Sequence, residues 1–277
     1  MVILFSLVAA ALYGSGDFLG GSASRRAAPF AVLLVSTPIG LAVLMAVAMS
    51  TPGTPTWAAL AWGTTAGLAA GIGLSILYGA LAAGPMSVVA PVSALTSAMV
   101  PVGYAVATGE YLDPLVYVGV ALCLAAIAMV SLESGERPGR LRAGRGAVLA
   151  VASGVGFGLF FILIRHTDPD SGAWPLVGSR AAAVAVAVVA VLVLRVPLSG
   201  TRAVLWLAIP AGLFDALGNL SYLLATRAGL LSLSAVITSL YPSVTVLLAR
   251  IVYTERLRRI QGLGLLVAGV GVAVLAV

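Results

Sequence analysis

LYGALAAGPMSVVAPVSALTS, residues 77–97, and YLLATRAGLLSLSAVITSLYP, residues 222–242, are two versions of one pattern. The second stretch begins 145 residues after the first, and this offset places Ser87 opposite Ser232. Similarity at a fixed offset indicates an internal duplication, in which one structural unit is built twice from the same chain. The pattern therefore predicts a fold made of two related halves.

The composition decides the environment of these halves. Of the 277 residues, 61% are hydrophobic and only 9% are charged, and the mean hydropathy is +1.14. A soluble domain carries about 25% charged residues. So few charges could not cover a water-exposed surface, and we expect an all-α integral membrane protein with many spans. We place it in a cytoplasmic (inner) membrane of the bacterial type.

Apolar runs long enough to cross a bilayer need about 20 residues each. Turn signals separate ten such runs along the chain. The ten predicted helices lie near residues 2–21, 29–49, 57–82, 86–107, 114–132, 146–164, 175–194, 203–225, 230–252 and 260–277.

The ten helices fall into two repeats of five, over residues 1–132 and 146–277, joined by an arginine-rich central loop at 133–145. Because five is odd, the second repeat must enter the membrane the opposite way up. Inverted repeats are common in transporters, whose substrate site lies near the membrane midplane between the halves. We therefore expect two inverted five-helix repeats around a central cavity.

Arginines predict the orientation. All 15 basic residues are arginine, which cluster at the ends of apolar runs, so the net charge of +6 reflects membrane topology and not nucleic-acid binding. The connections after odd-numbered helices carry eleven arginines, and those after even-numbered helices carry only Arg165 and Arg227. The positive-inside rule then places the central loop in the cytoplasm and both termini outside.

Two charged residues lie deep within apolar runs. Asp215 is near the centre of the eighth predicted helix, with Asn219 and Tyr222 on the same face four and seven residues later. A carboxylate, an amide and a phenol on one face predict the lining of a cavity. Arg180, within the seventh helix, could pair with Asp215 or bind a carboxylate or phosphate of a substrate. An Arg180–Asp215 pair would make Asp215 a poor proton carrier.

A third charge, Asp17, lies in YGSGDFLGG, residues 13–21. Its cost inside a membrane makes it a candidate for proton or cation coupling, as is Asp215, although Asp17 could also reach interfacial water. The glycines lack the spacing of a nucleotide-binding loop. We interpret them, like Gly63, Gly67 and Gly71 of the third helix, as positions at which helices approach closely, Gly20 included.

Tyrosines complete the predicted cavity, namely Tyr13, Tyr78 and Tyr241. Two glutamates at equivalent hairpins, Glu110 and Glu255, are expected to have a structural role, such as starting the helix that follows each of them.

Several features make the sequence resemble the EamA family of the drug/metabolite transporter superfamily. They are the AxxAGxxS element at 80–87, its counterpart ATRAGLLS at 225–232, the SLYPSVTVLLA stretch at 239–249, and the GE and TE hairpins at 109–110 and 254–255. The first repeat departs from the second at Ser97, which lies opposite Pro242, so the two helices are expected to bend differently. The resemblance implies ten helices around a central cavity, alternating access and export of small metabolites.

We therefore expect a secondary transporter that moves small organic metabolites, most of all amino-acid-like solutes, across the membrane, in the direction of export. An antiporter of cationic drugs and protons, or a lipid-handling membrane protein, are the alternatives. With one cysteine, Cys123, and one histidine, His166, the chain offers no metal cluster or catalytic triad, and we expect no enzymatic activity and no cofactor. The expected partners are a small-molecule substrate, membrane lipid and, as a candidate coupling ion, the proton. No nucleic acid is expected, and two repeats within one chain are compatible with a monomer.

Overall fold

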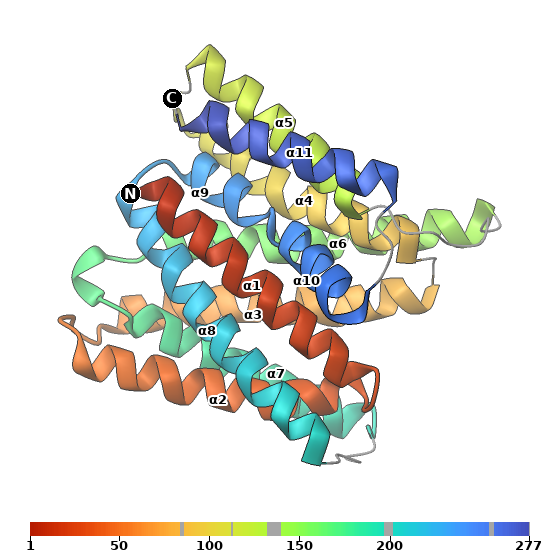
Figure 1. The fold of residues 1–277 in the computed structure, drawn as a ribbon. Helices are drawn as coiled ribbons and strands as arrows, with labels where there is room; N and C mark the ends of the chain where they lie inside the picture. The colour runs from red at the N-terminus through yellow and green to blue at the C-terminus, as the bar shows by residue number, and fades with distance from the viewer. Residues whose placement is uncertain (84–85, 112, 132–139, 197–201, 255–257, 277) are drawn as a thin grey trace.

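The protein is a bundle of helices with both chain termini at the same end (Figure 1). The structure, a computed structural model, describes residues 1–83, 86–111, 113–131, 140–196, 202–254 and 258–276. The helices are α1 (Val2–Ser24), α2 (Pro29–Ser50), α3 (Trp57–Ala83), α4 (Met86–Ala107), α5 (Pro114–Ser131), α6 (Arg140–Arg165), the 3-10 helix η1 (Pro169–Ser171), α7 (Trp174–Val193), α8 (Arg202–Ala228), α9 (Leu231–Thr238), α10 (Tyr241–Tyr253) and α11 (Arg259–Leu275).

The helices are long and apolar, as the composition predicts. Seven segments of the described chain are long and apolar enough to cross a membrane, and α9 and α10 together form one of them. Three shorter apolar helices accompany them, at Val92–Ala107, Pro114–Val130 and Arg259–Leu275. The prediction of an all-helical, multi-span membrane protein is confirmed. The number ten stays a prediction, because seven segments of the described chain meet both the length and the hydropathy of a membrane span.

The ninth predicted helix, residues 230–252, is not continuous. It is divided into α9 and α10 by Ser239 and Leu240. Pro242 accounts for the break, because its ring lacks an N–H group and clashes with the preceding turn of a helix. The Leu240 N–H instead donates to the Ile237 carbonyl over 3.1 Å, a bond that tightens the end of α9. The predicted span is therefore found at Leu231–Tyr253, and it is broken near Pro242, where a bend was expected.

Helices from the two halves of the chain pack in matching pairs. α1 packs along α8, and α3 packs along α6; likewise α2 contacts α8, and α3 contacts α7. The predicted duplication makes α1, α2, α3, α4 and α5 the counterparts of α6, α7, α8, α9–α10 and α11. Exchanging each helix for its counterpart converts the α1–α8 pair into the α6–α3 pair, and the α2–α8 pair into the α7–α3 pair. The α2–α7 and α5–α11 contacts each join a helix to its own counterpart. This symmetric packing is what a duplicated five-helix unit would produce.

Glycines permit the close contact between α3 and α7. A Cβ atom at Gly67 would lie 2.7 Å from the Ser179 Cα, and one at Gly63 would lie 2.6 Å from the carbonyl carbon of Pro175. Any larger side chain at these positions would force the helices apart. By contrast, nothing lies within 4 Å of a Cβ built at Gly20, so the expectation that Gly20 serves helix packing is wrong. That position borders the cavity described next.

Candidate functional site

A cavity of about 520 Å³ lies between α1, α2, α3, α7 and α8. Near the middle of the bundle it is bordered by Arg180 and Asn219. From there it extends toward the end of the bundle at which α1 ends and α2 begins, where Ser24 and Pro29 border it. Most of its lining is apolar, so the few charged groups that it contains decide which polar ligands it can hold.

An ion pair joins Arg180 of α7 to Asp215 of α8 in the cavity wall. The Arg180 side chain is only 9% exposed, whereas 40% of the Asp215 side chain remains exposed. A charge buried without a partner is strongly destabilising, so the pair permits the guanidinium to lie within the bundle. The carboxylate keeps one part open to the cavity, where a solute can reach it.

Asp215 is also contacted by its own helix. The Asn219 side-chain amide donates to the Asp215 carbonyl over 2.6 Å and to its carboxylate over 3.4 Å. Tyr222, on the same predicted face, does not border the cavity. It is fully buried, with its hydroxyl donating to the Phe161 carbonyl over 3.1 Å and its ring centre 4.4 Å from that of Phe161. Tyr222 therefore supports the wall behind the cavity.

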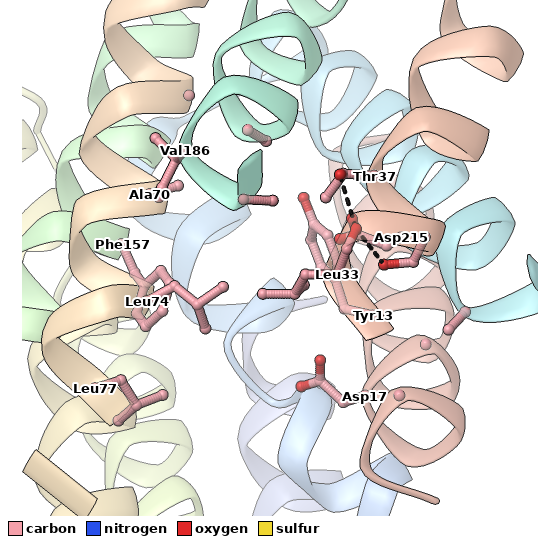
Figure 2. A pocket seen from close by; sticks show the side chains of 18 of the residues that line it. Tyr13, Asp17, Leu33, Thr37, Ala70, Leu74, Leu77, Phe157, Val186 and Asp215 are labelled. Carbon is pink, nitrogen blue, oxygen red and sulfur yellow. Dashed lines mark hydrogen bonds between the residues drawn. The ribbon is translucent and has the colours of Figure 1, made fainter. Parts of the chain in front are cut away.

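Asp17 faces the cavity from α1, at a level separate from that of Asp215 (Figure 2). It makes no ion pair with any residue in the described part of the chain. Tyr13 lies between these two carboxylates in the same view, and Tyr241, at the start of α10, also lines the cavity. The side chain of Tyr78 lies outside the part of the chain that the structure describes.

An aromatic wall was not foreseen from the sequence. Phe157, Phe160 and Phe161 of α6 all border the cavity, and the rings of Phe160 and Phe161 lie 5.8 Å apart. Their spacing of three and four residues places them on one face of a helix. That spacing was the only sign of this wall in the sequence. It was not sufficient, because phenylalanines within an apolar run can equally face lipid.

At the opposite end of the bundle, Glu110 links two helices. It follows α4 and contacts the first turn of α9. The backbone N–H groups of Leu231 and Ser232 donate to its two carboxylate oxygens, each over 3.0 Å, and the Ser232 hydroxyl donates as well. The expectation that Glu110 starts the helix after it is wrong, since Asp113 caps α5 through the Leu115 N–H. Glu110 instead caps a helix 122 residues away in sequence. Its counterpart, Glu255, lies outside the described residues.

Two arginines add polar contacts at this same end. The Arg227 guanidinium donates to the Gly172 carbonyl over 2.9 Å and to the Asp168 carbonyl over 3.0 Å. The Arg165 guanidinium donates to the Thr226 carbonyl over 2.6 Å. These bonds join the connection between α6 and α7 to the last turns of α8. Hydrogen bonds therefore connect the helices at the end of the bundle opposite to Ser24 and Pro29.

This fold and site define a class: an all-helical, multi-span membrane protein with a charged cavity between its helices. The EamA-like transporter family matches residues 144–277, which is the second half of the chain. This half of the chain belongs to the family, which is part of the drug/metabolite transporter superfamily. The protein is thus a membrane transporter of small solutes in general terms, and it sits in lipid.

The fold is also found among solved structures. One crystal structure of a protein is similar over 99% of this chain and 96% of its own, with a TM-score of 0.82 and 20% identity. At this identity the similarity concerns the fold alone. No curated protein is similar enough to this chain to count as a match.

Proposed function

We propose that the protein is a secondary transporter that moves small, amino-acid-like solutes by alternating access and works as an exporter. The observation that carries this proposal is the position of the charges. Arg180, Asp215 and Asp17 all border one cavity in the interior of the bundle. Charged groups inside a membrane protein are costly and mark the path of a substrate or ion.

Alternating access is supported by the difference between the two ends of the bundle. The cavity reaches toward one end, while Glu110, Arg165 and Arg227 bind carbonyl and N–H groups at the other. Two symmetry-related halves can exchange these arrangements by rocking against each other around a site between them. The break between α9 and α10 supplies a place where one half can bend next to the cavity.

The proposed substrate class follows from the charges. A guanidinium binds a carboxylate through two parallel hydrogen bonds, so Arg180 is suited to the carboxylate of an amino acid. Asp17, at a separate level, is suited to the amine of the same molecule (Figure 2). With one arginine and two aspartates, the cavity favours zwitterions over simple anions.

A second candidate function is the exchange of a cation for protons. It is favoured by Asp17, which lines the cavity and makes no ion pair within the described chain. In this alternative Asp17 binds either a proton or the cationic substrate.

The direction of transport follows from the orientation that the arginines predict. Arg25 and Arg26 follow α1, and Arg195 follows α7, at the end toward which the cavity extends. Under the positive-inside rule this end faces the cytoplasm, so solutes would load from there. That arrangement suits an exporter.

A binding screen followed by transport tests this proposal. Purified protein is heated with amino acids, organic acids and cationic drugs, since a ligand of the native state raises the melting temperature. We expect stabilisation by an amino acid that is lost in Arg180→Ala, and uptake of the same amino acid into proteoliposomes. A cationic compound whose effect is lost in Asp17→Asn would favour the second candidate. Absence of binding and of uptake across all three classes would contradict both.

A further inference from the structure

A second, apolar gap opens between α3 and α7. The two helices are pressed together where Gly63 meets Pro175 and Gly67 meets Ser179, and they separate beyond the contact of Gly71 with Val186. The space between them has a volume of about 690 Å³. From α3 it is lined by Leu68, Ile72, Ser75 and Gly79. From α7 and the residue that follows it, the gap is lined by Ala185, Val186, Val189, Ala190, Val193 and Leu194.

The gap adjoins the charged cavity. Phe30, Ser75 and Val186 each line both spaces. At its outer side the gap meets the membrane-facing surface, where Ile72 is 54% and Val193 is 73% exposed. The gap therefore lies between the charged cavity and the membrane-facing surface of α3 and α7.

The gap contains almost no polar group to bind a polar solute. Its lining is aliphatic apart from Phe30 and Ser75, and the Ser75 hydroxyl already donates to the Gly71 carbonyl over 3.0 Å. A space of this kind favours an alkyl chain, because transfer of each methylene group out of water is favourable. The adjoining cavity, with two aspartates and one arginine, favours an amine.

We propose that the gap between α3 and α7 is a subsite for the apolar tail of the transported solute. The substrates are then amphipathic amines or zwitterions, whose polar head lies among Asp17, Asp215 and Arg180 and whose aliphatic tail extends between the two helices. This inference rests on the proposed transport of amino-acid-like solutes and adds a requirement on their side chains. An acyl chain of a membrane lipid, resident in the gap, is the competing occupant.

The test uses straight-chain α-amino acids of increasing length, from alanine through norleucine to 2-aminodecanoate. Their binding to the purified protein in lipid nanodiscs is measured by calorimetry. Burial of one methylene group is worth about a fourfold gain in affinity, so the dissociation constant should fall about fourfold per carbon until the gap is filled.

A variant that fills the gap isolates this effect. A Cβ at Gly79 would meet nothing within 4 Å, so Gly79→Phe fills the gap from α3 without a clash at its root. Gly269→Phe is the matched control, because Gly269 of α11 is equally open and lies away from the gap. Ala190→Phe fills the gap from α7 and serves if Gly79→Phe does not fold.

The proposal expects that Gly79→Phe loses the gain in affinity with chain length, while Gly269→Phe keeps this gain. Equal affinity along the series in the unmodified protein, with alanine still bound, would overturn the subsite and leave the transport function standing. A gain that Gly79→Phe and Ala190→Phe leave intact would place the tail elsewhere, as a resident lipid chain predicts. Absence of binding by every member would overturn the substrate class, and the uptake assay then decides the transport function separately.

Discussion

The contact between Glu110 and α9 offers a direct way to perturb the end of the bundle away from the cavity. Glu110→Gln preserves the shape of the side chain but replaces one carboxylate oxygen by an amino group, which cannot accept a bond from the Leu231 or Ser232 N–H. Losing one capping acceptor costs about 1 kcal/mol. Removing a negative charge from the start of a helix costs about 0.5–1 kcal/mol more. The total of about 1.5–2 kcal/mol corresponds to roughly a 10- to 30-fold change in an equilibrium.

If the Glu110 contact exists only while that end of the bundle is closed, weakening the contact shifts the equilibrium by this whole factor. The protein then populates more of the state in which that end is open. Ala105 can report the shift, because it is 1% exposed and packs in one cluster with Leu231. We expect the thiol of Ala105→Cys to react roughly 10–30 times faster with a water-soluble, membrane-impermeant maleimide when Glu110→Gln is added. Cys123, the natural cysteine, is fully buried and contributes little background.

Asp113→Asn is the matched control. It neutralises a nearby exposed carboxylate whose bond, from the Leu115 N–H, stays at the start of α5 and does not reach α9. We expect it to leave the reaction rate of the Ala105→Cys thiol unchanged. An unchanged rate with Glu110→Gln, or an equal increase with Asp113→Asn, would refute the idea that the Glu110 contact holds this end closed.

Three other predictions follow from the site and the packing. Asp215→Asn should abolish transport in proteoliposomes that contain equal amounts of folded protein, because the cavity loses the carboxylate that pairs with Arg180; a fully active variant would remove Asp215 from the mechanism. Gly67→Leu should lower the free energy of unfolding by about 1–3 kcal/mol through overpacking against Ser179, measured as a lower melting temperature than that of Gly269→Leu. A reporter fused to the C-terminus should be active outside the cytoplasm, and a cytoplasmic signal would reverse the predicted orientation.

Much of the fold could be predicted because its signals are local. Runs of apolar residues, turn residues between them and small residues at helix contacts are all visible within a few positions of each other. The bend in the ninth predicted helix was expected from Pro242, which lies within an apolar run. Its full division into α9 and α10 was not, because a broken helix is as apolar as a continuous one.

Long-range contacts could not be predicted from such signals. The duplication of Glu110 indicated a structural role, yet its partner lies 122 residues away, at a helix start that any nearby carboxylate could have capped. The pairing of Arg180 with Asp215 was one of several alternatives, because opposite charges within two helices do not by themselves fix how those helices rotate. The aromatic wall and the gap between α3 and α7 depend on which faces meet, and an almost uniformly apolar sequence leaves the faces unmarked.

The Arg180–Asp215 pair has a consequence for which solutes the cavity can hold. A carboxylate that binds Arg180 competes with Asp215, and it leaves that aspartate without its partner inside the bundle. An unpaired ion in such surroundings costs several kcal/mol. A solute that also carries an amine offsets this cost itself, since the amine can bind Asp215 or Asp17, whereas a simple carboxylate needs an accompanying cation. Under the proposed function, one arginine among two aspartates therefore favours a zwitterion over a simple carboxylate, and the ion pair with Asp215 stabilises the buried Arg180 guanidinium when no solute is bound.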